Sequence, residues 1–390
     1  VMLTGVNVAL GVTGSIAAVK VVELAHELRR RGASVRAVVT DSAQGILHPW
    51  AVEFATDNPV VTEITGSVEH VELCGRDGWA DVFLVAPATA NTVGKVASAI
   101  DDTPVTTCAT TALGADVPVL VAPAMHEPMY DHPGVLEAID QLEAWGVEFV
   151  APRVEEEKAK IATEDAIALE LARVVTPSPL DGRHVVVTSG ATSEPIDPVR
   201  VLTSRASGKT GRAVARACYA YGANVALVHD APDTDYATGR RVETAAEMLE
   251  EVQDLVGALP VDALVSAAAI SDYTTDAADE KLRSGKDVTL DLQQTPKLID
   301  TVRESNPDLP IVGFKAETSG DDDAMVDAAR ETLERADLSF VVANDASVMG
   351  EDETRALFVR EGSVRERRGS KDELGFEVAD ELVDELSAGE

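Results

Sequence analysis

The stretch "SRASGKTGRA" (residues 204–213) contains a glycine, a lysine and a threonine in the order that phosphate-binding loops use. In the P-loop pattern G-x-x-x-x-G-K-[ST], Gly208, Lys209 and Thr210 require a further glycine at position 203, but that residue is Thr203. A β-branched side chain lacks the backbone freedom that this glycine supplies. The stretch is therefore not a P-loop, although a predicted helix that starts at Lys209 can still bind an anion through its backbone N–H groups.

A second candidate anion site follows the first predicted strand, in "GVTGSIAAVK" (residues 11–20). Gly14 permits a tight turn, and Ser15 places a hydroxyl group at the start of the next predicted helix. The segment "TDSA" repeats this arrangement after the second predicted strand, with Thr40 and Ser42. These hydroxyl groups fit two interpretations, an anion-binding site or ordinary helix N-caps.

Cysteine and histidine spacing gives no sign of a metal site or a disulfide framework. The three cysteines, Cys74, Cys108 and Cys218, form no C-x-x-C pair, and the seven histidines form no H-E-x-x-H motif. No metal ligands can be assigned from the sequence.

Composition and charge limit the possible classes of function. The chain of 390 residues, with 45% hydrophobic and 26% charged residues, has the composition of a folded globular protein. A net charge of −35 argues against nucleic-acid binding, which needs a basic face. Because the acidic residues are dispersed, we favour a surface adapted to concentrated salt; an acidic docking face for a cationic partner is the alternative.

No targeting or membrane segment is expected. No apolar run approaches the roughly 18 residues of a membrane span, and the N-terminus predicts a first strand and not a signal peptide. We therefore expect a cytoplasmic protein that does not bind a membrane.

The pattern of apolar runs predicts an α/β protein with two doubly wound parallel sheets. In the first half, residues 34–40, 81–89 and 117–125 predict buried strands, and residues 15–32 predict a helix between the first two strands. The segment "VVTPSPLDGRH" predicts a linker, after which the alternation of strands and helices restarts. Ligands of such sheets bind at the carboxyl ends of the strands. Because neither half contains G-x-G-x-x-G, a dinucleotide-dependent dehydrogenase is disfavoured.

Four ordered motifs in residues 5–135 resemble the flavin-dependent cysteine decarboxylase family, in particular phosphopantothenoylcysteine decarboxylases: "GVTGSIAAVK", "GSVEHVEL", "APATANTVGK" and "APAMHEPMY". The resemblance implies a flavodoxin-like domain that uses FMN, which supplies the redox chemistry needed for the loss of CO₂. It assigns the catalytic role to His70. The implied FMN contacts are Gly14, Ser15, Thr40, Ser42, Ala88 and Thr89. The implied substrate contacts are Asn91, Met125, His126 and Met129.

The first half departs from this family in three places. The interval from His70 to the following Ala80 and Asp81 is three residues longer than in the bacterial pattern. His126 replaces an asparagine of the substrate motif, and it can still donate a hydrogen bond or carry charge towards a carboxylate. Many bacterial members carry an A-C-G lid with a proton-donating cysteine, whereas the corresponding "PRVEEEKAKIATED" contains none. Either Lys158 or Lys160 serves as the acid, or the reduction step differs.

Residues 188–200, 204–211, 268–273, 313–318 and 343–345 resemble the motifs of the phosphopantothenate–cysteine ligase domain. The resemblance implies a Rossmann-like domain that binds CTP with Mg²⁺ and joins 4'-phosphopantothenate to cysteine. It assigns catalytic roles to Ser204, which replaces an asparagine of the family, and to Lys209. It implies a CTP site formed by Ala268, Ala269, Ile270, Asp272, Lys281, Thr295, Pro296, Lys297, Leu298 and Phe314.

Together the two resemblances predict a bifunctional enzyme of coenzyme A biosynthesis, with an FMN-dependent decarboxylase in residues 1–176 and a CTP-dependent ligase in residues 181–390. They imply a homo-oligomer with a trimeric flavoprotein core and a dimeric ligase. The alternatives are a regulatory subunit on the same flavoprotein scaffold, or a decarboxylase of peptidyl cysteine. The ligase motifs of the second half disfavour both.

Overall fold

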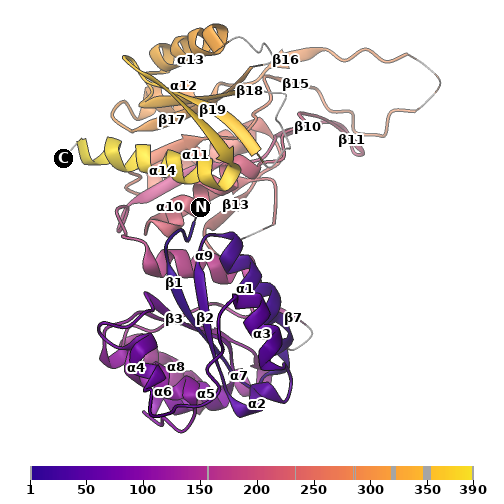
Figure 1. Cartoon of the computed structure of the whole chain (residues 1–390). Helices are drawn as coiled ribbons and strands as arrows, with labels where there is room; N and C mark the ends of the chain where they lie inside the picture. Colours follow the sequence, from indigo (N-terminus) through magenta and orange to yellow (C-terminus); the bar gives the residue numbers. More distant parts are fainter. Residues whose placement is uncertain are drawn as a thin grey trace. The chain divides into compact units, whose positions relative to one another are not determined.

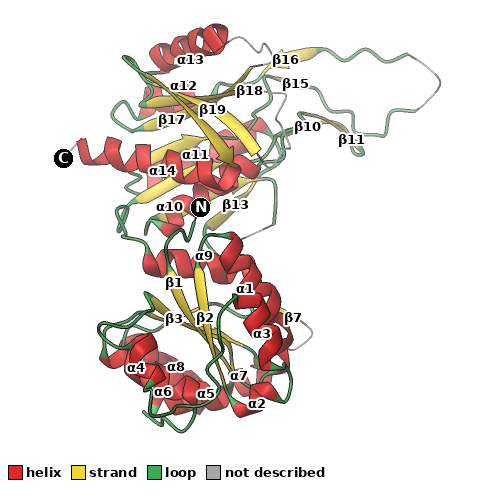
Figure 2. Ribbon diagram, in the orientation of Figure 1, coloured by secondary structure: helices red, strands yellow, loops and turns green. Residues whose placement is uncertain are grey.

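The computed structural model describes residues 2–155, 158–232, 234–283, 285, 287–317, 322–345 and 353–388. It divides into two compact units, residues 1–177 and 178–390, and the division falls in the predicted linker. Figures 1 and 2 show that each unit contains its own sheet with helices packed against it. The predicted α/β class with two doubly wound sheets is confirmed.

The first unit alternates strands and helices as its apolar runs predict. Its strands are β1 (Asn7–Val12), β2 (Ser34–Val39), β3 (Val82–Ala88), β4 (Val119–Pro123), β5 (Met125–His126), β6 (Glu148–Phe149), β7 (Arg153–Glu155) and β8 (Lys158–Lys160). Its helices are η1 (Ile16–Lys20, a 3₁₀ helix), α1 (Val21–Arg30), α2 (Asp41–Gln44), α3 (Pro49–Thr56), α4 (Glu69–Cys74), α5 (Ala90–Ala97), α6 (Pro104–Gly114), α7 (Glu127–Tyr130), α8 (Pro133–Ala144) and α9 (Glu164–Val175).

The main sheet of the first unit is parallel, with the order β2-β1-β3-β4-β6. This is the flavodoxin-like order, in which the chain reverses direction across the sheet between β1 and β3. Alternate strand residues face opposite layers. Phe83 and Val85 join a buried cluster with α4, α5, α6 and α8, whereas α1 contacts β2 and α9 contacts β4. Because both faces are covered, the strands are apolar throughout.

The second unit also alternates strands and helices, and its main sheet has eight strands in the described residues. The strands of this unit are β9 (His184–Thr188), β10 (Ser193–Asp197), β11 (Arg200–Thr203), β12 (Asn224–His229), β13 (Thr238–Arg241), β14 (Ala263–Ser266), β15 (Tyr273–Thr275), β16 (Leu292–Gln294), β17 (Ile311–Glu317), β18 (Phe340–Asp345), β19 (Glu353–Val359) and β20 (Val364–Ser370). The helices are α10 (Lys209–Ala220), α11 (Ala245–Ala258), α12 (Leu298–Ser305), α13 (Asp322–Ala336) and α14 (Lys371–Ala388).

The main sheet of the second unit has the order β13-β12-β9-β14-β17-β18-β19-β20. Its first six strands are parallel and follow the Rossmann order, with the chain reversal between β9 and β14. The last two strands are antiparallel, so the sheet is mixed where the sequence predicted a parallel one. One face packs on α10 and α14, and the other on α11, α12 and α13.

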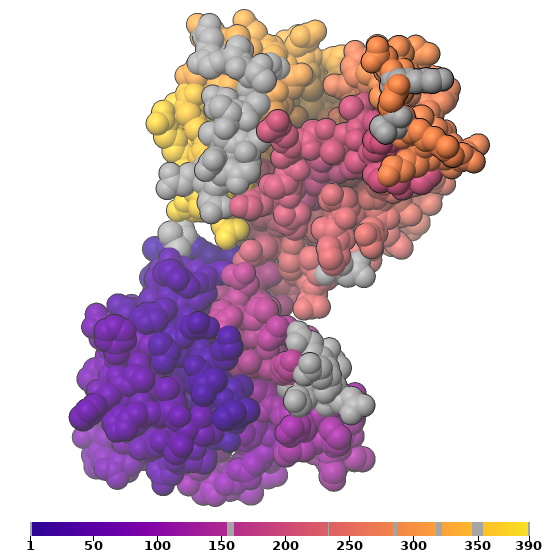
Figure 3. Space-filling model, turned by 90° about the vertical axis from the view of Figure 1, so that its right-hand side faces the viewer, coloured from indigo at the N-terminus to yellow at the C-terminus, as the bar shows by residue number. Residues whose placement is uncertain are grey.

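Two hairpins extend from the second unit beyond its main sheet. Strands β10 and β11 pair antiparallel, and so do β15 and β16. The described residues between β15 and β16 project away from their unit in Figure 1, and their orange atoms stand in front in the view of Figure 3. Among the helices that the structure describes, none is long and apolar enough to cross a membrane.

Candidate functional site

Each unit places part of its candidate residues at the point where the strand order reverses. In the first unit, two hydroxyl groups tie together the loops that follow β1, β3 and β4. Thr13 Oγ1 donates to the carbonyl of Pro87 at 2.7 Å and accepts from the Thr89 N–H at 3.2 Å. Ser15 Oγ donates to the carbonyl of Ala124 at 3.0 Å. The structure therefore brings the predicted FMN residues Ser15 and Thr89 to one edge of the sheet, together with the predicted substrate motif that follows β4.

Gly14 closes this site from the β2 side. A Cβ atom at position 14 would lie 2.4 Å from Ser42 Oγ and 2.6 Å from Ser42 Cβ, so the loop after β1 passes directly against the loop after β2. Ser42 Oγ also shares a hydrogen bond of 3.0 Å with Thr40 Oγ1. Only glycine permits this approach, and it leaves a surface of backbone and hydroxyl groups.

The predicted hydroxyl residues also cap helices. The side chains of Ser15, Thr40 and Thr89 accept hydrogen bonds from the first turns of η1, α2 and α5. The ordinary capping interpretation is therefore correct for all three. It does not compete with ligand binding, because each capped turn still presents further N–H groups at the same edge of the sheet.

His70 lies on α4, which packs against α6. The imidazole is half-buried, and its Nδ1 atom is enclosed without a hydrogen-bond partner in the described part of the chain. A buried polar atom without a hydrogen-bond partner is exceptional in a folded protein, which sets His70 apart from the histidines whose side chains cap helices. Within the same described residues, no hydrogen bond joins His70 to the loops after β1, β3 and β4.

The predicted substrate residues lie beyond β3 and β4. Asn91 is exposed on the first turn of α5, Met125 and His126 form β5, and Met129 is 48% exposed on α7. Strand β5 pairs with β8, and the register places His126 opposite Lys158. The segment that replaces the cysteine lid is thus hydrogen-bonded to the predicted substrate motif.

The second unit has a pocket at the reversal between β9 and β14. The pocket encloses about 140 Å³. It is lined by Gly190, Ala206, Ser207, Gly208, Lys209, Thr210, Gly211, Ala267, Ala268, Ala269, Phe314, Ala316, Asn344 and Lys371. Three predicted CTP residues (Ala268, Ala269 and Phe314) therefore meet the predicted anion loop in one cavity.

Glycines set α10 close against the end of β9. A Cβ atom on Gly208 would lie 2.7 Å from the backbone nitrogen of Gly190, and one on Gly211 would lie 2.7 Å from Ser189 Cβ. Ser189 Oγ donates to the carbonyl of Gly208 at 2.8 Å. This contact places the start of α10, with Lys209 as its first residue, directly over the sheet edge.

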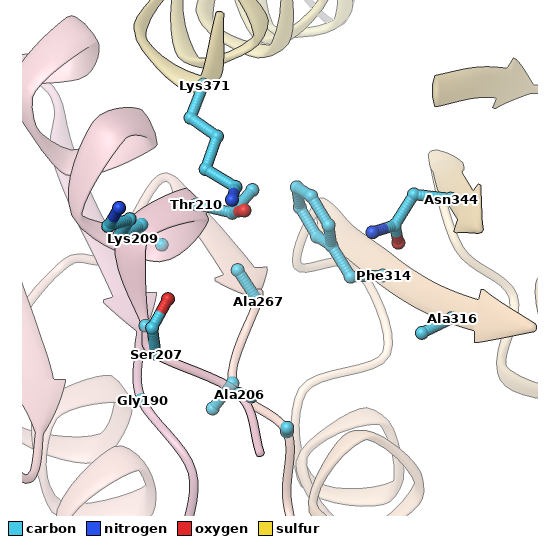
Figure 4. Close-up of a pocket in the computed structure, with 14 residues that line it drawn as sticks. Gly190, Ala206, Ser207, Lys209, Thr210, Ala267, Phe314, Ala316, Asn344 and Lys371 are labelled. Carbon is cyan, nitrogen blue, oxygen red and sulfur yellow. The ribbon is translucent and has the colours of Figure 1, made fainter. Parts of the chain in front are cut away.

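Lys371 enters the same pocket from α14. Figure 4 shows its side chain extending towards Thr210, with Phe314 and Asn344 across the cavity. Helix α14 can pack closely against α10 because Gly375 has no side chain. A Cβ atom at position 375 would lie 2.5 Å from the carbonyl oxygen of Ala213. No sequence motif marks Lys371, since its place in the pocket depends on the packing of two helices that are far apart in the chain. Asn344 could be identified from the sequence, because it belongs to the ligase motif at residues 343–345.

A second group of predicted CTP residues lies outside the lining of this pocket. Lys297 forms an ion pair with Asp272. The Thr295 N–H donates to the carbonyl of Asp272 at 3.1 Å, and Thr295 Oγ1 donates to the carbonyl of Ser271 at 2.5 Å. Asp272, Thr295 and Lys297 are therefore brought together in front of α12, with the exposed Pro296 between the last two.

The remaining predicted ligase residues differ in their surroundings. Leu298 is buried in the core on the α11–α13 side, so its side chain serves the fold, and the partly buried Ile270 packs against the same cluster. Ser204 Oγ accepts from the Ala206 N–H at 3.2 Å. Lys281 is exposed between β15 and β16 and is not among the residues that line the pocket.

Comparisons with known proteins match both units. Residues 1–176 match the family model described as Flavoprotein, and residues 180–387 match the DNA/pantothenate metabolism flavoprotein C-terminal domain. The chain is 46% identical to the coenzyme A biosynthesis bifunctional protein CoaBC of Thermococcus kodakarensis over 385 residues, which cover 97% of this chain and 95% of that protein. It is 33% identical to the protein of the same name from Methanocaldococcus jannaschii, over 98% of this chain and 94% of that protein. Among solved structures, the crystal structure of the C-terminal domain of CoaBC matches with a TM-score of 0.46 and 27% identity, covering 54% of this chain and 99% of that one.

Proposed function

The chain belongs to the family of bifunctional coenzyme A biosynthesis proteins, and on that premise we propose how its two units divide the chemistry. It is an enzyme that joins 4'-phosphopantothenate to cysteine and then decarboxylates the product to 4'-phosphopantetheine. We assign decarboxylation to residues 1–176 and ligation to residues 181–390. The observation that carries this assignment is that each unit has a site at its own strand reversal, and each family's motifs gather at one of the two.

The first unit fits FMN, the cofactor that the flavoprotein match supports. An anion at the Gly14 loop would meet backbone N–H groups and the hydroxyl groups of Ser15, Ser42 and Thr89. Donors of this kind can bind an anion without a basic side chain. When bound, FMN supplies the redox chemistry that allows a carboxylate beside a thiol-bearing carbon to leave as CO₂. The chain's own residues hold the two reactants in register and exclude water.

We assign proton transfer in the first unit to two groups. The first is His70, whose half-buried imidazole on α4 would exchange a proton with the substrate. For the step that family members perform with a lid cysteine, we assign Lys158 or Lys160, because β8 pairs with the substrate strand β5. Met125, His126 and Met129 would then contact the pantothenoyl chain and the carboxylate.

In the second unit, the pocket at the start of α10 suits a phosphate group. Its volume of about 140 Å³ is smaller than the roughly 300–1,000 Å³ of a site that encloses a whole ligand. Lys209, Lys371 and the N–H groups after Gly208 are the donors that a phosphate needs. The rest of the nucleotide would follow Ala268–Asp272 towards the pair formed by Asp272 and Lys297.

The ligation chemistry then proceeds in two balanced steps. The carboxylate of phosphopantothenate attacks the α-phosphate of CTP and releases pyrophosphate, which leaves an acyl-cytidylate. The amine of cysteine attacks the acyl carbon and releases CMP. Mg²⁺ would enter with the triphosphate, because a metal held mainly by phosphates needs few protein ligands. In the described residues, no cluster of three or more His, Cys, Asp or Glu side chains could hold a metal ion.

The oligomer that we propose, a trimeric flavoprotein core with dimeric ligase units, has support in exposed apolar side chains. Trp50 and Phe54 on α3 are each 76% exposed. Val199 on the β10–β11 turn, and Tyr273 and Leu292 on the second hairpin, are also exposed. Trp50 and Phe54 are one helical turn apart on α3, so they form a contiguous apolar surface of the kind that another subunit covers. We also propose that the enzyme is cytoplasmic.

The ligase assignment is tested by the variant Lys371→Ala in the full chain. We expect ligation to lose about tenfold or more in kcat/KM, the scale of one charge-assisted hydrogen bond, with bound flavin unchanged. Arg330→Ala removes an equal charge from an exposed position on α13 and should leave ligation intact. Equal activity of the Lys371 and Arg330 variants would reject the pocket as the phosphate site. Ligation that proceeds equally with ATP would reject the preference for CTP.

A further inference from the structure

The backbone of Leu282, next to Lys281, is held at both of its polar atoms by the β10–β11 hairpin. The Leu282 N–H donates to Asp197 Oδ2 at 3.0 Å, and Arg200 Nη1 donates to the Leu282 carbonyl at 3.1 Å. Four residues earlier, the Ala278 N–H donates to the carbonyl of Ile196 at 2.9 Å. Lys281 therefore lies on a short segment that is fixed at both ends to one hairpin.

Asp197 is the centre of this attachment. Its carboxylate is buried and accepts from the N–H groups of Val199 at 2.8 Å and Arg200 at 2.9 Å, besides that of Leu282. The Arg200 guanidinium forms an ion pair with the same carboxylate. A buried carboxylate with four donors stays ionised and rigid, because each donor would otherwise lose its partner.

The other end of the hairpin is joined to the nucleotide residues. Thr203 Oγ1 donates to the carbonyl of Thr192 at 2.8 Å, and the Ser271 N–H donates to Thr192 Oγ1 at 2.8 Å. Ser271 precedes Asp272, the partner of Lys297. The hairpin thus connects the group around Asp272 at its base to the Lys281 segment at its turn.

We propose that Asp197 is a positioning residue of the ligation reaction, which acts on CTP only through Lys281. It touches no ligand itself; it fixes the place from which the Lys281 ammonium group reaches the nucleotide. This inference rests on the proposed assignment of Lys281 to CTP binding. It adds a residue whose role cannot be deduced from the chemistry of its own side chain, because a carboxylate repels a triphosphate.

The test is a double-mutant cycle on CTP affinity in the full chain, with Asp197→Asn, Lys281→Ala and the two combined. Each single variant should weaken CTP binding by about tenfold, because a displaced ammonium group loses its contact as a deleted one does. In the Lys281→Ala background, Asp197→Asn should cause no further loss, since residues that act through one contact are not additive. Additive losses would overturn the proposal.

Two controls separate this role from a structural one. Asp262 resembles Asp197 in its contacts: it accepts a hydrogen bond from the His184 N–H at 2.7 Å and pairs with Arg183. It lies at the amino ends of β9 and β14, whereas the nucleotide site lies at the carboxyl ends. Asp262→Asn should lower thermal stability without changing CTP affinity, and a loss of CTP affinity there would overturn the proposal. If Asp197→Asn does not fold, Arg200→Ala removes the guanidinium that donates to the Leu282 carbonyl, and this variant takes the place of Asp197→Asn in the cycle. If Lys281→Ala alone leaves CTP affinity unchanged, the assignment of Lys281 fails, and the inference with it; additivity after a real Lys281 effect rejects only the inference.

Discussion

Gly211 is the position where a single methyl group should separate the two activities of this enzyme. An alanine Cβ atom there would lie 2.7 Å from Ser189 Cβ, 2.8 Å from the Thr188 carbonyl oxygen and 2.9 Å from Ser189 Cα. Carbon atoms in ordinary contact are about 3.5–4.0 Å apart, so the start of α10 must shift by roughly 1 Å. None of the three neighbouring atoms can rotate away, because all belong to backbone or to a Cβ.

This shift sets the expected size of the effect of Gly211→Ala. Overpacking of this kind costs about 1–3 kcal/mol of stability in the second unit. A displacement of about 1 Å at a binding group costs up to roughly 10²-fold in rate. We therefore expect kcat/KM for ligation to fall by about 10- to 100-fold, measured as CMP release from CTP, while CO₂ release from 4'-phosphopantothenoylcysteine is unchanged.

A matched variant in the same unit controls for the added methyl group. Gly257 lies within α11, and a Cβ atom there would meet nothing within 4 Å. Gly257→Ala should keep full ligation and gain up to about 1 kcal/mol of stability, since alanine favours helix over glycine. If Gly211→Ala lowered thermal stability but ligated at the parent rate, the start of α10 would not bind the reactants and the reasoning would be refuted.

Three further predictions test other parts of the account. His70→Asn should abolish CO₂ release and preserve ligation, because the two sites lie in different units; simultaneous loss of both activities would indicate a folding role. The net charge of −35 should make the thermal midpoint rise between dilute buffer and about 1 M KCl, where the Debye length falls to roughly 3 Å; an unchanged midpoint would reject adaptation to salt. Burial alone would raise the pKa of Asp197, but hydrogen bonds from Val199, Leu282 and Arg200 outweigh it and hold this pKa at about 2. Since the folded pKa lies below the ordinary value of 3.8, the stabilisation is complete above about pH 4 and is lost as the pH falls towards 2. Asp197→Asn should therefore flatten the dependence of the thermal midpoint on pH in that interval, and a curve parallel to the parent's would contradict the assignment.

The strands and the motif loops were predictable because their signals are local. Buried parallel strands must be apolar throughout, so residues 34–40 and 81–89 identified β2 and β3 to within a residue. The glycine at position 14 was also recognisable, since a turn between a strand and a helix favours it. The predicted helix over residues 15–32 begins instead as the 3₁₀ helix η1, a difference in hydrogen bonding that side-chain periodicity does not record.

The parts of the site that the sequence could not predict depend on contacts between distant segments. Lys371 reaches the pocket because Gly375 packs against Ala213, and neither residue carries a chemical signal of its own. The sequence likewise did not predict that β19 and β20 extend the parallel sheet as antiparallel strands, since this pairing joins them to β18 only in the folded unit. Leu298 is a further example, because the resemblance assigns it to the CTP site and only the assembled structure reveals that its side chain lies in the core.

The most direct test of the division of labour between the two units is the variant Gly14→Ala, assayed for both reactions in one preparation. The added Cβ atom would lie 2.4 Å from Ser42 Oγ and should disrupt the loop that we assign to FMN. We predict that the purified variant loses its visible flavin absorbance and its CO₂ release, while CTP-dependent ligation continues at the parent rate. Gly114→Ala, where a Cβ atom meets nothing within 4 Å, should retain flavin and both reactions. Loss of ligation together with the flavin, or retention of flavin and CO₂ release by the Gly14 variant, would contradict the account.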